Sequence, residues 1–512
     1  MAAFVMSNLV GLLRTILVAR AFGTLPEMEA FTPANRVSET LFNLVAGGAL
    51  ASAFIPTFTG LLTRGERRGA WKLASAVANL VLLAATLASL LAAIFAPLIV
   101  RYILAPGFAL DPEKEALTVS LLRLMLPSAI IFGLSGLVMG ILNSYQVFFI
   151  PALAPSMYGL GMIFGTLVLT PSMGIYGLAW GVLIGAGLHL LLQVPSLLRL
   201  GGSYSPILGL NQPDVREVIR LMLPRLLGVA AVQLNFWVNT RIASTQPEGS
   251  INGITYAFML MLMPQAAIAQ SIAIAALPTF SAQYALGKVD EMRLSLAASL
   301  RGIILLTLPA SLGLIILRQP LVELLLQRGN FDSHSTTLVA WALLWYAVGL
   351  LGHSIVEIMA RAFYSLHDTK TPVLVGIAAM GLNIVFSLGF SALFTGLGWM
   401  PHGGLALANS VATTLEMVGL LFLMRRRLKG LEGRRVLVLA GQASLATLGM
   451  CLVLWGWMNW SGVSATWMVM LGGVLLGCLT YGLIALLLGV SEVRGATRWL
   501  MRRGAYLLRP GA

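Results

Sequence analysis

Long apolar windows separated by short polar stretches dominate the sequence. Windows near 20 residues, which is the length of a helix that crosses a bilayer, recur about fourteen times. The predicted spans are 2–23, 34–62, 74–104, 117–142, 148–170, 174–198, 218–243, 251–284, 297–326, 337–365, 372–396, 402–424, 436–458 and 465–489. The pattern therefore predicts an all-α polytopic membrane protein with about 14 transmembrane helices.

The composition excludes an ordinary soluble protein. Of the 512 residues, 58% are hydrophobic and 10% are charged, whereas a soluble domain carries roughly a quarter charged residues. The N-terminal segment lacks a basic leader region, so we expect a retained first span rather than a cleaved signal peptide. Cys451 and Cys478 lie in apolar segments, which predicts neither a disulfide framework nor a CxxC metal site.

The basic residues indicate an orientation in the membrane. The net charge is +14, but the lysines and arginines gather in the loops 63–72 and 424–435 and in the C-terminal tail. The loops 24–33 and 244–253 contain neither lysine nor arginine. By the positive-inside rule both termini are cytoplasmic, and this distribution argues against a nucleic-acid partner.

An internal repeat divides the chain. FIPTFTGLLTRGERR (54–68) matches ALPTFSAQYALGKVD (276–290), and LNSYQVFFIPAL (142–153) matches FYSLHDTKTPVL (363–374) at nearly the same offset. Spans 1–6 and 7–12 are therefore predicted to be parallel six-helix repeats, an arrangement that alternating-access transporters use. The predicted domains are an N-terminal lobe (1–200), a C-terminal lobe (201–430), and a final region (431–512) with two unpaired spans and a basic cytoplasmic tail.

Charged residues inside the spans are the candidate functional residues. Arg14 lies deep in span 1, where insertion of a guanidinium costs about 2.5–3.5 kcal/mol, so we expect it to face a cavity or an anionic substrate. Further candidates for substrate binding are Arg20, Glu29, Arg36 and Arg241. Arg20 and Arg241 also fit interface anchors that extend toward the headgroups, and Arg36 fits a salt bridge with a carboxylate one turn away.

A second group predicts a proton relay or a gate. His353, Glu357 and Arg361 follow one another at i, i+4 spacing, which places them on one helix face. An intramembrane acid beside a histidine is typical of proton relays, although structural pairing explains the same spacing. Glu39 in span 2 joins this group as a relay or gate candidate.

Motifs for catalysis are absent from the sequence. It has no HExxH, GxSxG, P-loop or dinucleotide fingerprint, so we predict a protein that is not an enzyme and has no metal site. Within the spans arginines outnumber acids, which indicates an anionic cargo. A pyrophosphate would suit the fork of the guanidinium.

Several motifs resemble the MurJ (MviN) family of lipid II flippases, which belongs to the multidrug/oligosaccharidyl-lipid/polysaccharide (MOP) exporter superfamily. They are GLLRTILVARAFGT (11–24), GGALASAFIPTF (47–58), LNSYQVFFIPALAP (142–155), ALPTFSAQYA (276–285) and RAFYSLHDTKTP (361–372). The similarity extends over essentially the whole chain.

This resemblance implies a fourteen-helix fold with two six-helix lobes around a cationic cavity. Rocking of the lobes would move lipid II, an undecaprenyl-pyrophosphate-linked peptidoglycan precursor, from the inner to the outer leaflet of the bacterial plasma membrane. Spans 13 and 14 would form a groove for the polyprenyl tail, and the membrane potential would return the carrier without any cofactor. The implied setting is peptidoglycan and cell-wall biogenesis and cell shape, with cell-wall synthesis proteins as partners of a monomeric transporter.

The resemblance carries over to some positions and not to others. Arg14 matches the cavity arginine of span 1 in the family, and Arg20 matches the arginine of its VAR-x-FG motif. Glu29 keeps the charge of a family aspartate. Other positions lack the arginines that the family has there: Phe42, Asn43 and Met259.

Some members of the family bind sodium among spans 7, 11 and 12. Here Asn239, Asn383 and Thr413 could supply oxygen ligands, but Ser387 stands where an acidic ligand is expected. The resemblance therefore predicts no metal cofactor, with sodium kept as the alternative.

Two alternative functions stay open from the sequence. The chain could export another polyprenyl-linked saccharide, or it could be a non-transporting scaffold of cell-wall assembly. The scaffold hypothesis is motivated by the missing arginines at Phe42, Asn43 and Met259.

Overall fold

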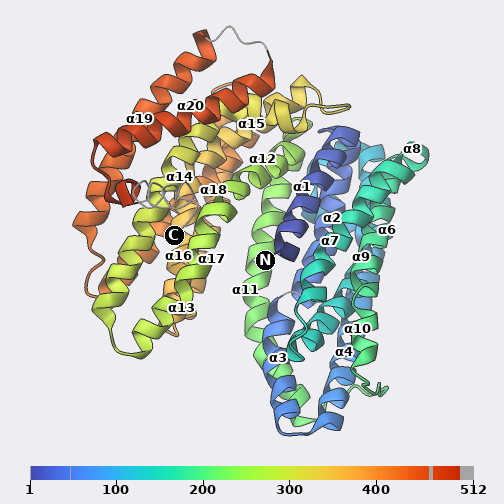
Figure 1. Ribbon diagram of the computed structural model, residues 1–512. Coiled ribbons are helices and arrows are strands. Elements are labelled where there is room, and N and C mark those ends of the chain that lie inside the picture. The colour runs from blue at the N-terminus through green and yellow to red at the C-terminus, as the bar shows by residue number, and fades with distance from the viewer. Residues whose placement is uncertain (1, 46–47, 461–464, 496–512) are drawn as a thin grey trace, which may run out of the picture. The chain divides into compact units, whose positions relative to one another are not determined.

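The computed structural model describes residues 2–45, 48–460 and 465–495. The first half of the described chain is helical, and its elements run roughly alongside one another (Figure 1). They are α1 (Ala2–Phe22), α2 (Pro26–Val45), α3 (Gly48–Thr63), α4 (Arg67–Ile94), α5 (Ala96–Leu98), η1 (Ile99–Leu104), η2 (Pro106–Leu110), α6 (Pro112–Ser144), α7 (Phe149–Phe164), η3 (Gly165–Leu169), α8 (Thr170–Met173), α9 (Ile175–Leu191), α10 (Val194–Arg199) and α11 (Pro213–Ser244).

The second half is helical as well. Its elements are α12 (Ser250–Gln265), η4 (Ala266–Gln270), α13 (Ser271–Ala285), α14 (Val289–Leu326), α15 (Ser333–Val348), α16 (Leu350–Ser365), α17 (Lys370–Gly396), α18 (His402–Arg427), α19 (Gly433–Trp460) and α20 (Thr466–Leu487). No strand occurs in the part of the chain that the structure describes, which confirms the predicted all-α class.

Eleven helices of the described chain are long and apolar enough to cross a membrane. The number rises to 12 if α15 and α16, which meet at a bend of 50°, form one span. The predicted count of about fourteen is therefore not confirmed. The predicted span 34–62 corresponds to two helices, α2 and α3, and residues 46–47 between them lie outside the described chain.

Contacts divide the chain into two compact units. Unit 1 contains residues 1–252 and 326–335, and unit 2 contains residues 253–325 and 336–512. Unit 1 includes α11, because this helix packs on α2 and α3. The boundary at residue 200, which rests on the sequence repeat, stays a prediction.

Within unit 1, glycines allow the backbone of α9 to contact the backbones of α7 and η3. A Cβ atom on Gly161 would lie 2.2 Å from the Cα of Gly185, and one on Gly165 would lie 2.6 Å from the Cα of Gly181. Small residues four positions apart are typical of closely packed membrane helices. This packing fixes α7, which carries part of the site described below.

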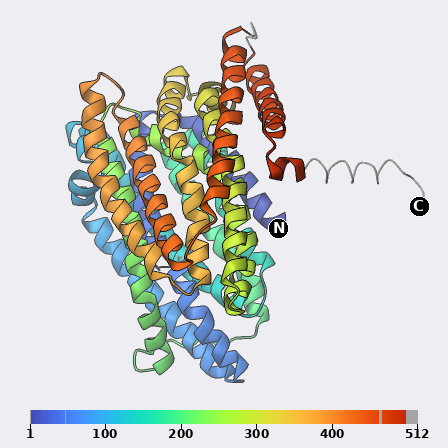
Figure 2. The ribbon, with the colours of Figure 1, turned by 90° about the vertical axis from the view of Figure 1, so that its left-hand side faces the viewer.

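In unit 2, α19 and α20 pack against each other as neighbouring helices (Figure 2). The hydroxyl of Tyr481 on α20 donates a hydrogen bond to the carbonyl of Leu305 on α14 at 2.6 Å. The hydroxyl of Thr466, at the start of α20, donates to a carboxylate oxygen of Glu323 at 2.5 Å. Both hydrogen bonds attach α20 to α14.

Candidate functional site

Arg14 lies in the middle of α1 and is half-buried. Its guanidinium carbon lies 5.9 Å from the ring centroid of Tyr158, and its Nη1 lies 3.8 Å from the sulfur of Met162. No carboxylate forms an ion pair with Arg14 among the described residues. The guanidinium of Arg14 therefore contacts an aromatic ring and a thioether, neither of which is charged. Its N–H donors stay available to an anionic ligand.

The neighbouring α2 contributes a charged pair to the same unit. Arg36 Nη1 lies 3.3 Å from Glu39 Oε2, and the amide of Asn35 donates to Glu39 Oε1 at 2.8 Å. The guanidinium carbon of Arg36 also lies 4.9 Å from the ring centroid of Phe236 on α11. The i, i+3 salt bridge that the sequence left as an alternative for Arg36 is thus present.

A cavity of about 350 Å³ lies within unit 1 beside these residues. Asn35, Glu39 and Tyr158 contribute to its lining, which brings α2 and α7 to one space. The buried hydroxyls of Ser38 and Ser128 also line it, and neither makes a hydrogen bond within the described chain. Buried polar atoms of this kind normally bind water or a ligand, so the cavity is suited to polar contents. We name Arg14, Asn35, Arg36, Glu39 and Tyr158 the Arg14 cluster.

A buried polar network adjoins the cavity. His189 on α9 lines it and lies 2.6 Å, Nδ1 to Oγ, from Ser135 on α6. The amide of Gln193 donates to the same hydroxyl at 2.8 Å. Sequence reasoning missed His189 and Tyr158, because it searched the spans for formally charged side chains and neither residue carries a formal charge.

Glu29 and Lys114 form a buried ion pair at 2.5 Å. The exposed side-chain fraction is 4% for Glu29 and 11% for Lys114. The backbone N–H of Ile251 also donates to Glu29, at 3.2 Å. The structure thus pairs Glu29, a candidate for substrate binding, with a lysine at the start of α6. The sequence carries no signal for this pair, since 85 positions separate the two residues.

Two candidate arginines lie outside the Arg14 cluster. The side chain of Arg20 is exposed, and its backbone carbonyl accepts a hydrogen bond from Asn330 at 2.9 Å. The guanidinium of Arg241, near the end of α11, donates to the carbonyl of Tyr102. The structure therefore pairs Arg36 with Glu39 and places Arg14 beside Tyr158, which lines the same cavity as Glu39. Arg20 and Arg241 have other partners.

The candidate relay residues of unit 2, His353, Glu357 and Arg361, do not all contact one another. Arg361 pairs with Glu357 at 2.7 Å, as their i, i+4 spacing predicts. His353 instead lies 2.9 Å from the side-chain oxygen of Asn409 and 3.4 Å from the hydroxyl of Thr413. The hydrogen-bond partners of His353 thus lie on α18, and Glu357 on its own helix α16 is not one of them.

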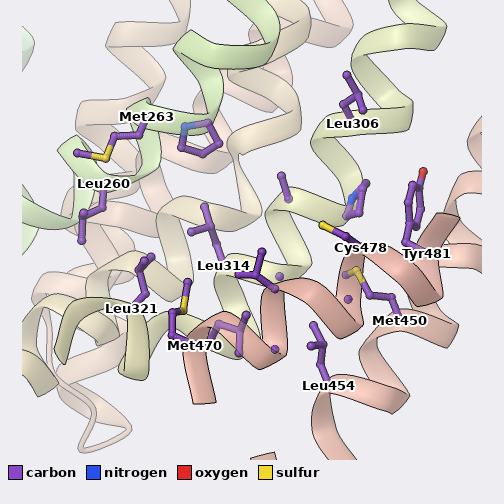
Figure 3. A pocket seen from close by; sticks show the side chains of 18 of the residues that line it. Leu260, Met263, Leu306, Leu314, Leu321, Met450, Leu454, Met470, Cys478 and Tyr481 are labelled. Carbon is purple, nitrogen blue, oxygen red and sulfur yellow. The ribbon is translucent and has the colours of Figure 1, made fainter. Parts of the chain in front are cut away.

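An apolar pocket of about 440 Å³ lies in unit 2 between α12, α14, α19 and α20 (Figure 3). Leucine, methionine and small residues line it, and Cys478 and Tyr481 of α20 lie on one side. The lining provides little that could bind a charged group. Its chemistry suits a hydrocarbon chain.

The model of the family described as "Lipid II flippase MurJ" matches residues 18–473. The chain belongs to this family. A MurJ flippase is a transporter rather than an enzyme, and it acts on a lipid-linked substrate in the membrane of bacteria.

Relatives and solved structures agree with this assignment. The lipid II flippase MurJ of Burkholderia cenocepacia is 32% identical over 470 residues, which are 90% of this chain and 89% of the relative. A probable lipid II flippase MurJ of Bdellovibrio bacteriovorus is 31% identical over 497 residues, which are 95% of this chain and 93% of the relative.

The fold agrees as well. A structure of lipid II flippase MurJ in an inward closed conformation superposes with a TM-score of 0.81 at 26% identity, covering 94% of this chain and 97% of the other. An inward-facing multidrug transporter of the MOP superfamily superposes with a TM-score of 0.67 at 17% identity, covering 83% and 96%, and it shows the fold alone.

Within this MurJ fold, three positions lack the arginines that the family pattern predicts. Phe42 packs on Phe132 with ring centroids 4.9 Å apart, and Asn43 lines the unit 1 cavity. Met259 lies half-buried on α12 in unit 2. At these three positions aromatic, amide and thioether groups stand where positive charge was expected.

Proposed function

We propose that this protein moves lipid II from the inner to the outer leaflet by alternating access, with Arg14 as the main ligand of the pyrophosphate. The observation that supports this role is the environment of Arg14, which has no carboxylate partner among the described residues. An unpaired guanidinium inside a membrane protein is costly unless it binds an anion. A pyrophosphate supplies several oxygens for bidentate contacts.

Arg36 is the second proposed ligand of the pyrophosphate. It lies 3.3 Å from Glu39, so a bound pyrophosphate would compete with this carboxylate for the guanidinium. Glu39 would then hold Arg36 ready before the substrate arrives and receive it again after release. Asn35 supports this arrangement, because the hydrogen bond from its side-chain amide to Glu39 holds the carboxylate in place.

The apolar pocket of unit 2 is the proposed site for part of the polyprenyl tail. Its lining comes from α12 and α14 together with α19 and α20, the two spans outside the sequence repeat. Burial of hydrocarbon against Leu314, Leu454 and Met470 would stabilise the tail by roughly 25 cal/mol per Å² only where it replaces contact with water. In a membrane the apolar pocket therefore sets the shape and orientation of the bound tail more than it adds to the affinity.

The membrane potential is the proposed driving force for the return step. The Arg14 cluster has two guanidiniums against one carboxylate, so the empty site is cationic. A potential that is negative inside would draw it inward by about 2.3 kcal/mol per charge per 100 mV. The proposal also includes a division into two lobes at residue 200 and cytoplasmic termini. The transporter is proposed to be a monomer that contacts cell-wall synthesis proteins.

Sodium is not part of the proposed mechanism. Asn383, Ser387 and Thr413 of unit 2 are buried neutral residues, and Ser387 stands where the family pattern expects an acid. Asn239, on α11, donates to the side-chain oxygen of Asn235 at 3.1 Å. The set lacks the carboxylate that would balance a bound cation, so these residues do not fit the expected sodium site.

Complementation tests the proposed function. Bacteria depleted of their own lipid II flippase should grow and keep their shape when they express this chain. Failure of the chain to support growth, with normal amounts in the membrane and a working positive control, would reject the lipid II assignment.

Reconstitution separates the alternatives. Proteoliposomes that translocate a different polyprenyl-pyrophosphate saccharide but not lipid II would identify another exporter. Protein that binds no lipid-linked pyrophosphate and co-purifies with wall synthases would identify a scaffold.

A further inference from the structure

A groove of about 840 Å³ lies in unit 2 where α18 ends and α19 begins. It is separate from the apolar pocket of Figure 3, since the two share no lining residue. Arg425 lies on the α18 side, Arg434 lies on the α19 side, and residues 428–432 connect the two helices. The groove thus combines two cationic side chains with an otherwise mainly apolar wall.

The two arginines of the groove differ in pairing from Arg427 and Arg435. Arg427 forms an ion pair with Asp368 at 3.8 Å, and Arg435 forms one with Glu432 at 3.6 Å. Arg425 and Arg434 have no ion pair or side-chain hydrogen bond within the described residues, and both are exposed. Arg425 and Arg434 are therefore unpaired positive charges that line the groove, whereas Arg426 and Lys429, which also have no ion pair within the described residues, do not line it.

One acidic side chain also lines the groove. The carboxylate of Glu432 contributes to the wall, but Arg435 neutralises it. The guanidinium carbon of Arg426 lies 4.3 Å from the ring centroid of Phe422, so this arginine lies over an aromatic ring at the edge of the groove. The balance of charge in the groove stays positive.

The apolar wall is exposed rather than covered by protein. The exposed fraction is 51% for Phe422, 73% for Leu437 and 55% for Val438. In a multi-pass membrane protein such side chains face acyl chains. An apolar wall that ends at two unpaired arginines matches a molecule with a hydrocarbon part and an anionic head.

We propose that this groove binds an anionic phospholipid, with the phosphate between Arg425 and Arg434 and an acyl chain along Phe422, Leu437 and Val438. A zwitterionic lipid fits less well, since its own ammonium group would lie beside the arginines. Free phosphate would use the arginines but not the apolar wall. The proposal is independent of the transported substrate, so it stands or falls separately from the flippase assignment.

Native mass spectrometry of the purified full-length protein tests the proposal, with phosphatidylglycerol, phosphatidylcholine and inorganic phosphate as probes. Each arginine near an anionic headgroup strengthens binding roughly fivefold. The double variant Arg425→Gln/Arg434→Gln should therefore lose phosphatidylglycerol binding by about 25-fold. Leu437→Ser should weaken phosphatidylglycerol binding and leave the response to phosphate unchanged.

A matched control removes two positive charges elsewhere. Arg64→Gln/Arg427→Gln changes the net charge equally, but both arginines are paired, with Glu66 at 3.4 Å and with Asp368, and neither lines the groove. This variant should bind phosphatidylglycerol within about twofold of the wild type, because the groove keeps both of its arginines. If the two double variants have equal thermal unfolding midpoints, the loss of lipid binding is not caused by a loss of folding.

Three results would overturn the proposal. Equal loss of phosphatidylglycerol in both double variants would indicate general attraction to a positive protein. Equal binding of phosphatidylcholine and phosphatidylglycerol would remove the requirement for an anionic head. Displacement of the lipid by millimolar inorganic phosphate would indicate a simple phosphate site.

Discussion

The ammonium group of Lys114 lies 2.5 Å from the carboxylate of Glu29, and both side chains are almost completely buried. The pair joins the first turn of α2 to the first turn of α6. Lys114 Nζ also lies 4.5 Å from the ring centroid of Phe108. Neither charge could stay in this environment alone, so the two helix ends are fixed relative to each other.

Removal of one partner of this pair should destabilise unit 1. Lys114→Met leaves the Glu29 charge buried and uncompensated, which typically costs about 3–5 kcal/mol. The double variant Glu29→Gln/Lys114→Met should recover much of the loss, because it leaves no unpaired charge. Thermal unfolding midpoints in detergent measure both effects. A double variant that is no more stable than Lys114→Met would argue against the ion pair.

Arg14 should be required for transport and not for folding. Arg14→Ala removes a charge-assisted contact worth about 1.5–3 kcal/mol, so lipid II translocation should fall by roughly ten- to a hundredfold. Arg14→Lys should keep part of the activity, since it retains the charge but loses the bidentate fork. Translocation in proteoliposomes gives the rates.

Leu13→Ala is the control for Arg14, because it changes an exposed neighbour on the same helix. It should transport normally. Full activity of Arg14→Ala would exclude Arg14 as the pyrophosphate ligand.

The glycine contacts between α7 and α9 should tolerate no side chain. Gly161→Ala places a Cβ atom 2.2 Å from the Cα of Gly185, so the helices must separate, at a cost of about 1–3 kcal/mol. Gly187→Ala on α9 is the matched control, because nothing lies within 4 Å of its Cβ position. Unfolding midpoints should fall for Gly161→Ala and stay constant or rise for Gly187→Ala. Equal effects would contradict the close packing.

The apolar pocket of unit 2 should be sensitive to its volume. Cys478→Trp fills space that we assign to the polyprenyl tail and should reduce lipid II binding and translocation several-fold, because the tail can no longer enter. Leu479→Trp is the control, since Leu479 is 69% exposed and does not line the pocket. Binding by native mass spectrometry separates a lost tail contact from a general defect. Unchanged binding in Cys478→Trp would place the tail elsewhere.

Asp368 should stabilise unit 2 in a pH-dependent way. The backbone N–H of Thr371 donates to its carboxylate at 3.0 Å and the Thr371 hydroxyl at 2.8 Å, which holds the pKa of Asp368 below its usual range. A lowered folded-state pKa gives stability that is complete above the unfolded value of about 3.9 and is lost as the pH falls through the folded value.

The variant Asp368→Asn tests this dependence. It should be less stable than the wild type at pH 7, and the difference should shrink below about pH 4, as Asp368 is protonated first in the unfolded wild type and then, at lower pH, in the folded wild type. Unfolding midpoints at pH 7, 5 and 3 measure the difference. A difference that is independent of pH would remove the carboxylate charge as the cause.

The sequence by itself determined the all-α class, the family and the positions of most spans. Runs of about 20 apolar residues have few alternatives in a bilayer, because every backbone polar group must be satisfied within the segment. Helical spacing also placed Arg36 with Glu39 and Glu357 with Arg361 on one face, and structural pairing was an open alternative for both sets.

Only the tertiary structure decided which distant residues meet. Glu29 pairs with Lys114, and Arg14 lies against Tyr158, because α6 packs on α2 and α7 packs on α1. His353 bonds to Asn409 on α18 instead of Glu357 on its own helix. Periodicity fixes the face on which a side chain lies, but the partner opposite that face depends on contacts between segments far apart in the chain.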